Sequence, residues 1–316
     1  MKAPLLAAAL VTLLAIMILL HHGAASETTG IRLGIELNTH ATAAWVALDK
    51  DLFNKYGLRV EKIVKFRTGL ELAAAFAKGE IDVAWACLAP LVKMIDKGAD
   101  IYIVQATHYY GYGCVGRPGI KSIDDLRSLA EPVVAVTGNG AQTHVLLLLA
   151  EKRYGFHAKI VFMKPPAILS AVLTGSVDAA CMPEPYVSIA EAKGLHVLLI
   201  AQDLWPGMPG SYLAVSGKYL EKHPEAVCKL ARINSEATSW AVNHLDGAAI
   251  IDSKYLGIPS EIAKTSLTRL QLTTSIDAEE MQKLVNTMYE YGLIKHRINI
   301  TSRLVDFEKL CPGERG

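Results

Sequence analysis

The stretch Thr137–Thr143 holds residue types that are well suited to binding a ligand. It reads Thr-Gly-Asn-Gly-Ala-Gln-Thr and leads into an expected helix at Gln142–Arg153. The two glycines allow the backbone to turn tightly and to approach a ligand closely, and the start of a helix presents unpaired N–H groups at its positive end. The spacing is neither a dinucleotide fingerprint nor a P-loop. The stretch favours a small anion or a carbonyl-rich ligand, contacted by Thr137, Asn139, Gly140, Ala141 and Thr143.

Three charged residues follow expected strands and could add to such a site. Arg67 comes after Val60–Phe66, and Lys164 comes after Lys159–Met163, so the two cations occupy nearly matching places. If they face a common cleft, they favour an anionic ligand. Glu184 stands between two prolines and could accept an ammonium or hydroxyl group. The alternative for Glu184 is pairing with a neighbouring helix terminus.

Aromatic side chains gather near the same loops. Aromatic walls with a few polar anchors are typical of small-molecule sites. Trp45 lies on the inward face of an expected helix and is predicted to belong to the core. The aromatic candidates for ligand contact are Trp85, Tyr109, Tyr186 and Trp205.

Nothing in the sequence indicates nucleophilic catalysis, a metal or a cofactor. There is no Gly-x-Ser-x-Gly and no His-Glu-x-x-His, so we predict a binding protein and not an enzyme. A net charge of +1 with no basic run gives no indication of nucleic-acid binding. The five cysteines show no metal-ligand spacing. Export would permit a disulfide, an odd count leaves at least one thiol free or paired between molecules, and most are expected to be small core residues: Cys87, Cys114, Cys181, Cys228 and Cys311.

An internal repeat indicates how these residues are positioned. A helix that stops at Tyr56-Gly57 is followed by a strand, a loop, a helix, and Gly79-Glu80-Ile81-Asp82 before another strand. The same order recurs after Tyr154-Gly155 and ends with Gly175-Ser176-Val177-Asp178. One pair of copies this far apart indicates a duplicated α/β unit, not a solenoid.

The order of elements predicts two lobes joined by two crossings. Strands and helices alternate from Ile31 to Ala106, which predicts a largely parallel sheet with helices on both faces. Ligands bind beyond the carboxyl ends of strands in such sheets, where the candidate loops lie. The crossings are expected near Tyr109–Gly113 and Trp205–Gly210, which makes a hinged clamshell. Beyond Gly217 the pattern predicts helices only, packed on the first lobe.

The N-terminus predicts export. Lys2, an apolar run and small residues before position 26 are typical of a signal peptide, with an uncleaved anchor as the alternative. In both cases the body of the chain lies outside the cytoplasm. We predict a signal peptide or anchor at residues 1–26, lobe 1 at residues 27–110 and 208–316, and lobe 2 at residues 111–207.

Several motifs resemble one family. Gly69–Ile103, which contains Lys78-Gly79-Glu80-Ile81-Asp82-Val83, resembles the sulfonate/nitrate/taurine-type solute-binding proteins of ABC transporters. Ser122–Leu126 and Met182–Tyr186 extend the resemblance, which covers about Ile31–Ser216. The superfamily also includes thiamine-pyrimidine-precursor-binding proteins and yeast-type pyrimidine synthases. The resemblance implies a two-lobed periplasmic-binding-protein fold of the type II kind, with two doubly wound sheets and a helical C-terminal tail on lobe 1.

The resemblance also implies a role. It implies a monomer that captures a small anionic solute, such as a sulfonate, taurine or nitrate, and delivers it to an ABC-transporter permease. A neutral heteroaromatic precursor stacked on Trp205 is the alternative solute. A synthase is disfavoured, because those enzymes carry a tight cysteine cluster and here the cysteines are dispersed. The ligand contacts that the resemblance implies are Asn38, His40, Thr68, Trp85, Cys87, Asn139, Thr143 and Glu184.

Overall fold

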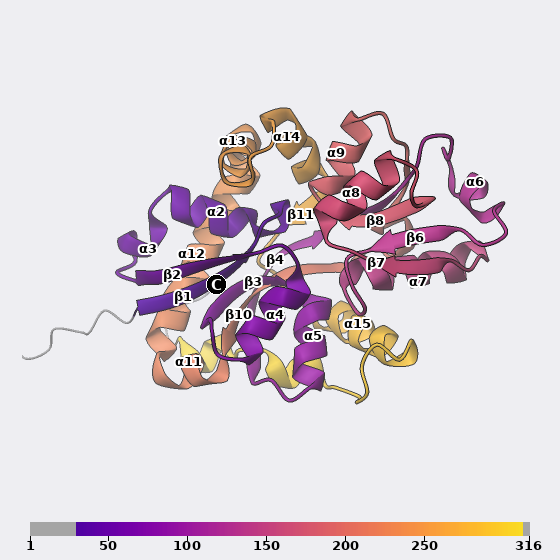
Figure 1. The fold of residues 1–316 in the computed structure, drawn as a ribbon. Coiled ribbons are helices and arrows are strands. Elements are labelled where there is room, and N and C mark those ends of the chain that lie inside the picture. The colour runs from indigo at the N-terminus through magenta and orange to yellow at the C-terminus, as the bar shows by residue number, and fades with distance from the viewer. Residues whose placement is uncertain (1–29, 312–316) are drawn as a thin grey trace, which may run out of the picture.

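Two β-sheets, each flanked by helices, lie side by side in the computed structural model, which describes residues 30–311 (Figure 1). The predicted signal peptide or anchor at residues 1–26 lies outside the described residues. Among residues 30–311, no helix has both the length and the apolar character needed to cross a bilayer. The expected two-lobed α/β fold is confirmed.

The first sheet combines strands from both ends of the described chain. Its order is β11-β4-β10-β3-β1-β2. β1 pairs in parallel with β2 and β3, whereas β10 is antiparallel to both of its neighbours and β11 is antiparallel to β4. The bounds are β1 Gly30–Glu36, β2 Arg59–Phe66, β3 Val83–Cys87, β4 Ile101–Tyr110, β10 Pro209–Ser216 and β11 Leu270–Leu272.

The second sheet repeats this plan with the middle of the chain. Its order is β7-β6-β8-β5-β9. β6 pairs in parallel with β7 and β8, and β5 lies antiparallel to β8 and β9. The bounds are β5 Tyr112–Gly116, β6 Val133–Val136, β7 Lys159–Phe162, β8 Ala179–Pro183 and β9 Val197–Ile200.

The internal repeat is confirmed by matching strand orders. β2-β1-β3 in the first sheet corresponds to β7-β6-β8 in the second. The prediction of a largely parallel sheet over Ile31–Ala106 is confirmed, because β1, β2, β3 and β4 run in one direction, whereas β10 and β5 enter their sheets next to β3 and β8 in the antiparallel direction. These are the strands that follow the crossings, so the chain arrives in each sheet from the other lobe. Both sheets are therefore mixed.

The first crossing is shorter than predicted. The sequence favoured a loop over His108–Gly113, but β4 continues to Tyr110 and β5 begins at Tyr112. The chain turns at Tyr110 and Gly111, with φ of 66° and 84°. His108, Tyr109 and Tyr112 are buried, so the strand shows no alternation of polar and apolar residues and reads as a loop. The second crossing passes through Trp205 to Met208, between α10 and β10, as expected.

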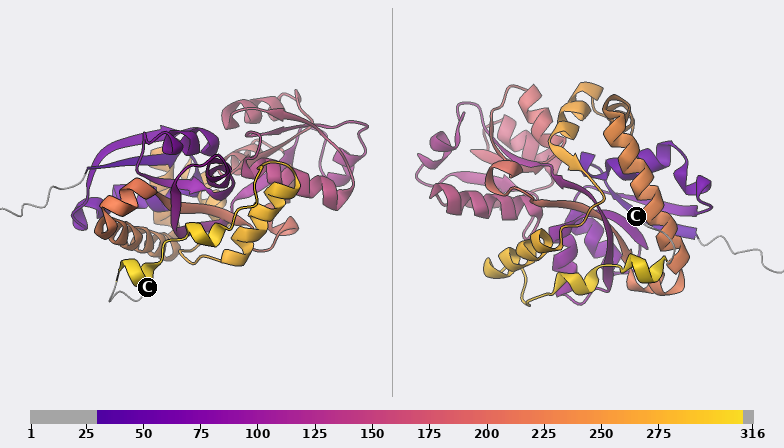
Figure 2. Two further views of the ribbon diagram at one scale, coloured as in Figure 1. Left: turned by 90° about the horizontal axis from the view of Figure 1, so that it is seen from below. Right: turned by 180° about the vertical axis from the view of Figure 1, so that it is seen from behind.

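Helices cover the outer faces of both sheets, and the C-terminal helices pack mainly on the first lobe (Figure 2). α12 lies against α2 and β4, and α15 lies against α5. The prediction of helices only beyond Gly217 is wrong at one point, because the three-residue strand β11 pairs with β4. The N-terminal helices are η1 Thr39–Ala41, α2 Thr42–Asp49, α3 Leu52–Lys55, α4 Gly69–Ala77, α5 Leu88–Asp96 and α6 Ile123–Arg127.

The remaining helices follow the same logic. α7 ends where Gly155 adopts a left-handed conformation with φ of 69°, which confirms the Tyr154-Gly155 stop. α14 of the first lobe contacts α9 of the second. The bounds are α7 Gln142–Tyr154, α8 Pro165–Leu173, α9 Tyr186–Ala192, α10 Ala201–Leu204, α11 Gly217–Lys222, α12 Pro224–Asn243, α13 Leu245–Leu256, α14 Ser260–Thr268, α15 Ala278–Glu290, η2 Ile300–Arg303 and α16 Phe307–Leu310.

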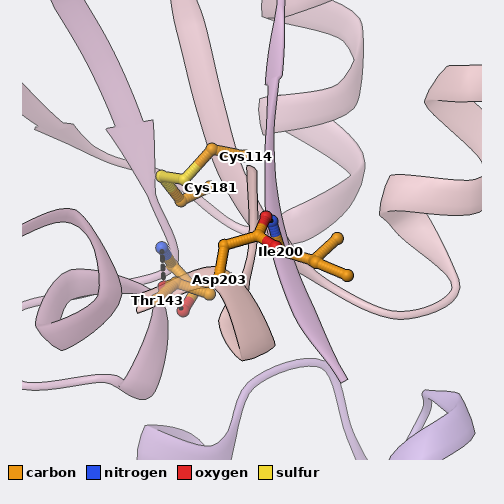
Figure 3. The surroundings of a disulfide bond; sticks show 6 residues. Cys114, Thr143, Cys181, Ile200 and Asp203 are labelled. Carbon is orange, nitrogen blue, oxygen red and sulfur yellow. Dashed lines mark hydrogen bonds between the residues drawn. A yellow bond between two sulfur atoms is a disulfide. The ribbon is translucent and has the colours of Figure 1, made fainter. Parts of the chain in front are cut away.

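Four cysteines form disulfides, which corrects the prediction that most of the five are plain core residues. Cys114 and Cys181 face each other on the antiparallel strands β5 and β8 and are bonded. Figure 3 shows this bond. A second disulfide joins Cys228 of α12 to Cys311, and the buried Cys87 is free. The pairing was not visible in the sequence because it depends on strand register, not on spacing.

The disulfide assignment predicts a thiol count and a stability change. The chain has five cysteines, so the unfolded, unreduced protein should show one thiol per molecule, and the reduced protein should show five. The bond Cys114–Cys181 closes a loop with a sequence separation of 67 residues. Its removal in Cys114→Ala/Cys181→Ala should lower the free energy of unfolding by about 2–4 kcal/mol in urea titrations. An unchanged urea midpoint, or five thiols without reductant, would contradict the assignment.

Candidate functional site

A small, partly open cavity lies between the two lobes, at the carboxyl ends of β1, β3, β6 and β8. Its volume is ≈ 20 Å³. The space therefore suits a group of a few atoms. Seven of the predicted site residues line it: Asn38, Arg67, Thr68, Cys87, Thr137, Ala141 and Thr143.

Helix starts from both lobes point their N-terminal ends toward this cavity. Among residues 30–311, the lining includes the first residue of α4, Gly69, and the first residue of α8, Pro165. It also includes the N-cap residues of α5 and α7, Cys87 and Ala141. Each of these helices is at least nine residues long, so each contributes a positive dipole end. Backbone N–H groups come from the starts of α4, α5 and α7, whereas α8 begins with two prolines, which have no N–H. With the guanidinium of Arg67, they favour negative charge in the cavity.

The predicted loop Thr137–Thr143 is confirmed as part of the cavity wall only in its first and last parts. The Thr143 hydroxyl accepts from the Thr137 amide at 3.1 Å and bonds the Thr137 hydroxyl at 2.7 Å. These bonds hold the strand end and the start of α7 together. Asn139 and Gly140 lie at the outer side of the loop, where the Asn139 carbonyl accepts from Lys93 of the first lobe.

A different chemistry occupies the opposite wall. Cys87 Sγ lies 3.0 Å from Glu36 Oε2, 3.0 Å from Tyr112 Oη and 3.5 Å from His40 Nδ1. His40 Nε2 lies 2.7 Å from the Gly111 carbonyl, and since a carbonyl only accepts, Nε2 carries the proton. Glu36 is 3% exposed. The wall is thus a buried cluster of a carboxyl, an imidazole and a thiol.

Burial disfavours charge on every member of this cluster. It raises the pKa of the Glu36 carboxyl and, together with the nearby Glu36 charge, holds the pKa of the Cys87 thiol well above its usual value. Burial also lowers the pKa of His40 to about 4. A nucleophilic cysteine needs a lowered pKa. Cys87 is therefore not an activated nucleophile here.

Glu184 forms a structural ion pair. Its Oε1 accepts from Arg269 Nη1 at 2.9 Å, and its Oε2 accepts from the Ser188 amide and the Ser266 hydroxyl. Glu184 belongs to the second lobe and Arg269 follows α14 of the first. The structure therefore supports the alternative interpretation of Glu184, in which its carboxylate pairs near a helix terminus. The partner is Arg269, a residue that no sequence pattern selects.

Three predicted aromatic contacts lie in the core, away from the cavity lining. Trp85 is 1% exposed and its indole N–H donates to Asn234 Oδ1 at 3.0 Å. Tyr109 donates its hydroxyl to the Ser275 carbonyl, and Trp205 donates to Glu280. The indole N–H or hydroxyl of each ring already has a hydrogen-bond partner, on α12, on α15 or in the segment before α15. Trp45 is fully buried, which confirms the prediction that it is a core residue.

The other predicted residues differ in position. Lys164 lies at the start of α8, but its ammonium pairs with Glu71 of α4 at 2.6 Å, so it joins the lobes at the rim. Tyr186, the first residue of α9, is half-buried. Burial raises the pKa of its hydroxyl, and the nearby positive charge of Arg67 reduces this rise. His40 reaches the cavity wall only through Cys87.

Two cavity residues with ionisable side chains, Glu36 and Tyr112, were not selected from the sequence. Glu36 ends β1, two positions before the predicted contact Asn38, and that position at a strand end was the available signal. Tyr112 was noted only as part of an aromatic run, and its hydroxyl contact with Cys87 depends on how β5 leaves Gly111. Tyr112 is placed by the crossing between the lobes, which the sequence pattern does not describe.

The lobes contact each other through polar groups around the cavity. Gln142 of α7 accepts from the Ala89 amide of α5 at 2.9 Å and donates to the Pro209 carbonyl. The Thr39 amide donates to the Glu184 carbonyl at 3.3 Å. These bonds close the cavity on several sides.

A small cavity between two α/β lobes, walled by helix starts, defines a solute-binding protein of the clamshell type. The chain belongs to the NMT1-like family, whose model matches residues 24–251. It is 28% identical over 256 residues to the nitrate/nitrite binding protein of Synechococcus elongatus, across 69% of this chain and 56% of that protein. The chain thus spans little more than half the length of that relative.

Solved structures show the same fold. The ligand-binding component of an ABC-type import system from Staphylococcus aureus, solved with zinc bound, has a TM-score of 0.80 at 17% identity and covers 91% of this chain and 100% of that one. The periplasmic aliphatic sulphonate binding protein of Escherichia coli has a TM-score of 0.73 at 22% identity, covering 89% and 98%. The Synechococcus elongatus and Escherichia coli relatives are both described as binding proteins, in agreement with the predicted binding role.

The ion pair between Glu184 and Arg269 yields a test of lobe packing. Arg269→Met should lower the free energy of unfolding by about 3 kcal/mol near neutral pH, because it leaves a buried carboxylate without its cation. Since burial raises the pKa of Glu184 and Arg269 opposes this rise, the loss should grow as pH rises and shrink as pH falls and Glu184 takes up a proton.

The control for that test is the double variant Glu184→Gln/Arg269→Met. It removes the charge together with its partner, and it should recover part of the loss in urea titrations. Equal stability of wild type and Arg269→Met across pH 5–8 would show that the pair contributes nothing.

Proposed function

We propose that this chain captures a small oxyanion, such as nitrate or the head group of a sulfonate or taurine, in the cavity between its lobes. The observation that carries the proposal is the convergence of the starts of α4, α5, α7 and α8 with Arg67 on one cavity between the lobes. Backbone amides at helix starts bind oxyanions without a full counter-charge. Arg67 adds charge-assisted donors in a planar fork that suits an oxyanion.

The size of the cavity supports a compact group over an extended one. The cavity volume is ≈ 20 Å³, so the space between the lobes holds a head group of a few atoms and not a long tail. The alternative solute, a heteroaromatic precursor, would need to stack on Trp205. That indole is only 3% exposed and packs in the core, so it offers no surface for stacking.

The relatives support a location outside the cytoplasm and a role in solute uptake. They are binding proteins for nitrate/nitrite and aliphatic sulphonates, one of them periplasmic. We infer that this chain acts as a monomer outside the cytoplasm and passes its solute to the membrane permease of an ABC importer. The predicted signal at residues 1–26 agrees with export.

Binding of the anion can be tested through Arg67. Nitrate, taurine and short alkanesulfonates should be titrated calorimetrically into the wild type, Arg67→Ala and Arg127→Ala. Loss of Arg67 should weaken the solute that binds by about ten- to a hundredfold, since a hydrogen bond to a charged group contributes about 1.5–3 kcal/mol.

Arg127 lies on α6, away from the cavity, and pairs with Asp124, so Arg127→Ala is the matched control and should bind as the wild type does. Absence of binding with all these anions, together with binding of pyrimidines, would favour the heteroaromatic alternative instead.

Closure around the solute predicts a change in shape. The ligand-free protein should populate an open form, and a saturating anion should reduce the radius of gyration in small-angle X-ray scattering. Gln142→Ala removes bonds from α7 to both Ala89 and Pro209, so it should shift the ligand-free protein further toward the open form. Identical scattering of all samples would contradict hinge closure.

A further inference from the structure

Three side chains with different ligand atoms meet in the buried wall of the cavity. Glu36, His40 and Cys87 each offer one such atom, and all three atoms lie within 4.8 Å of one another. All three residues are buried. We propose that Glu36, His40 and Cys87 bind a single divalent metal ion of the zinc class, with one coordination position open to the cavity.

Two of the three separations between the ligand atoms fit this ion with small movements, and the third, between Glu36 and His40, lies within 4.8 Å. Zinc bonds to sulfur at about 2.3 Å and to nitrogen or oxygen at about 2.0–2.2 Å, so neighbouring ligand atoms in a tetrahedral site lie about 3.3–3.6 Å apart. Cys87 Sγ is 3.5 Å from His40 Nδ1 and 3.0 Å from Glu36 Oε2. The first separation already fits, and the second needs to widen by about half an ångström.

The contacts behind the ligands are those of a metal site. A metal-binding histidine usually donates its other ring N–H to a carbonyl or carboxylate, which fixes the ring and directs the free nitrogen to the ion. His40 does this through Nε2 and the Gly111 carbonyl at 2.7 Å. The lone pair of Nδ1 is therefore directed toward Cys87. His40 is also confined by the rings of His108 and Tyr112, each with its centroid 4.6 Å away.

The sulfur is surrounded by groups that suit a thiolate. The hydroxyls of Tyr112 and Ser211 donate to Cys87 Sγ at 3.0 and 3.4 Å. A plain buried thiol needs no such donors, whereas a metal-bound thiolate is stabilised by them. On binding, the Cys87 thiol and the Glu36 carboxyl each give up the proton they hold to solvent, so two negative ligands balance the two charges of the ion.

An unpartnered polar atom stands beside the cluster. Asn38 is 5% exposed and lines the cavity, and its Oδ1 has no hydrogen-bond partner within the described residues. Its amide nitrogen lies 3.4 Å from Glu36 Oε2. A buried acceptor without a donor is costly, and a metal-bound water in the cavity could satisfy it.

The donor set also selects the kind of ion. A thiolate and an imidazole with one carboxylate oxygen favour zinc-class ions over magnesium or calcium, which prefer oxygen ligands throughout. With three protein ligands the fourth position would face the space assigned to the anion. An oxygen of the solute would then be the fourth ligand of the ion, and this part of the proposal rests on the proposed function. Binding of the ion by the three side chains does not depend on it.

The test uses cobalt(II) as a spectroscopic probe of the full chain. Cys87 is the one free thiol of the five cysteines, since the other four form disulfides. A cobalt–thiolate charge-transfer band in the near-ultraviolet can therefore come only from Cys87. The wild type should give this band with one equivalent of cobalt, and one equivalent of zinc should abolish it.

Variants assign the ligands. Cys87→Ser should lose the band, and His40→Gln should bind cobalt at least about tenfold more weakly. The matched control is His157→Gln, an exposed histidine of the second lobe, which should bind as the wild type does. Cobalt held elsewhere, for example by His21 and His22, gives no thiolate band. A wild type without the band, or a His40→Gln variant with unchanged affinity, would overturn the proposal.

The same samples separate this proposal from the proposed function. Anion titrations in the presence of EDTA report the helix starts and Arg67 without metal. If the anion binds in EDTA and no thiolate band forms with cobalt, the metal site is rejected and the anion site stands. If the band forms and no anion binds, the metal site stands and the proposed anion site is rejected.

Discussion

The site depends on one topological constraint, which is that the chain passes between the sheets twice and each passage inserts a strand antiparallel to its neighbours. β10 enters beside β3 and β5 enters beside β8. The remaining strands β1, β2 and β3 therefore stay parallel, as do β6, β7 and β8. Their carboxyl ends meet between the lobes, and so do the helices that follow them. A cavity rich in helix starts follows from this arrangement before any particular side chain is considered.

The two walls of the cavity differ in chemistry because different parts of the chain form them. The helix starts of α4, α7 and α8 come from the repeated unit; α4 and α7 present backbone amides, and α8, which begins with two prolines, contributes the positive end of its dipole. The opposite wall consists of Glu36 at the end of β1 and Cys87 at the end of β3, held by Tyr112 and Gly111 from the crossing. A full cation on that side would repel the positive helix ends, whereas a metal ion neutralised by a thiolate and a carboxylate would not. The proposed ion and the proposed anion are thus electrostatically compatible.

Most of the fold was predictable from the sequence because it rests on local periodicity and on a repeat. The Tyr-Gly stops, the Gly-x-Ile/Val-Asp turns and the loop at Thr137 all appear where the pattern placed them. The misses depend on long-range pairing. β11 has three residues and exists through its bonds to β4, and Cys114 meets Cys181 through register alone. The ring of Trp205 is fixed by Glu280, on a helix 75 residues further along.

The contacts that close the lobes are suited to a protein that must open again. The rim pair of Lys164 and Glu71 has side chains that are 59% and 40% exposed, and such pairs contribute little, about 0–1 kcal/mol. Gln142 adds hydrogen bonds to backbone atoms, each of modest net value. Closure by these contacts alone is therefore weak, and a solute stabilises the closed form only through contacts that it makes there and not in the open form. Amides of both lobes line the cavity, so a bound anion would bring together helix starts that separate on opening, and its binding energy would be coupled to closure.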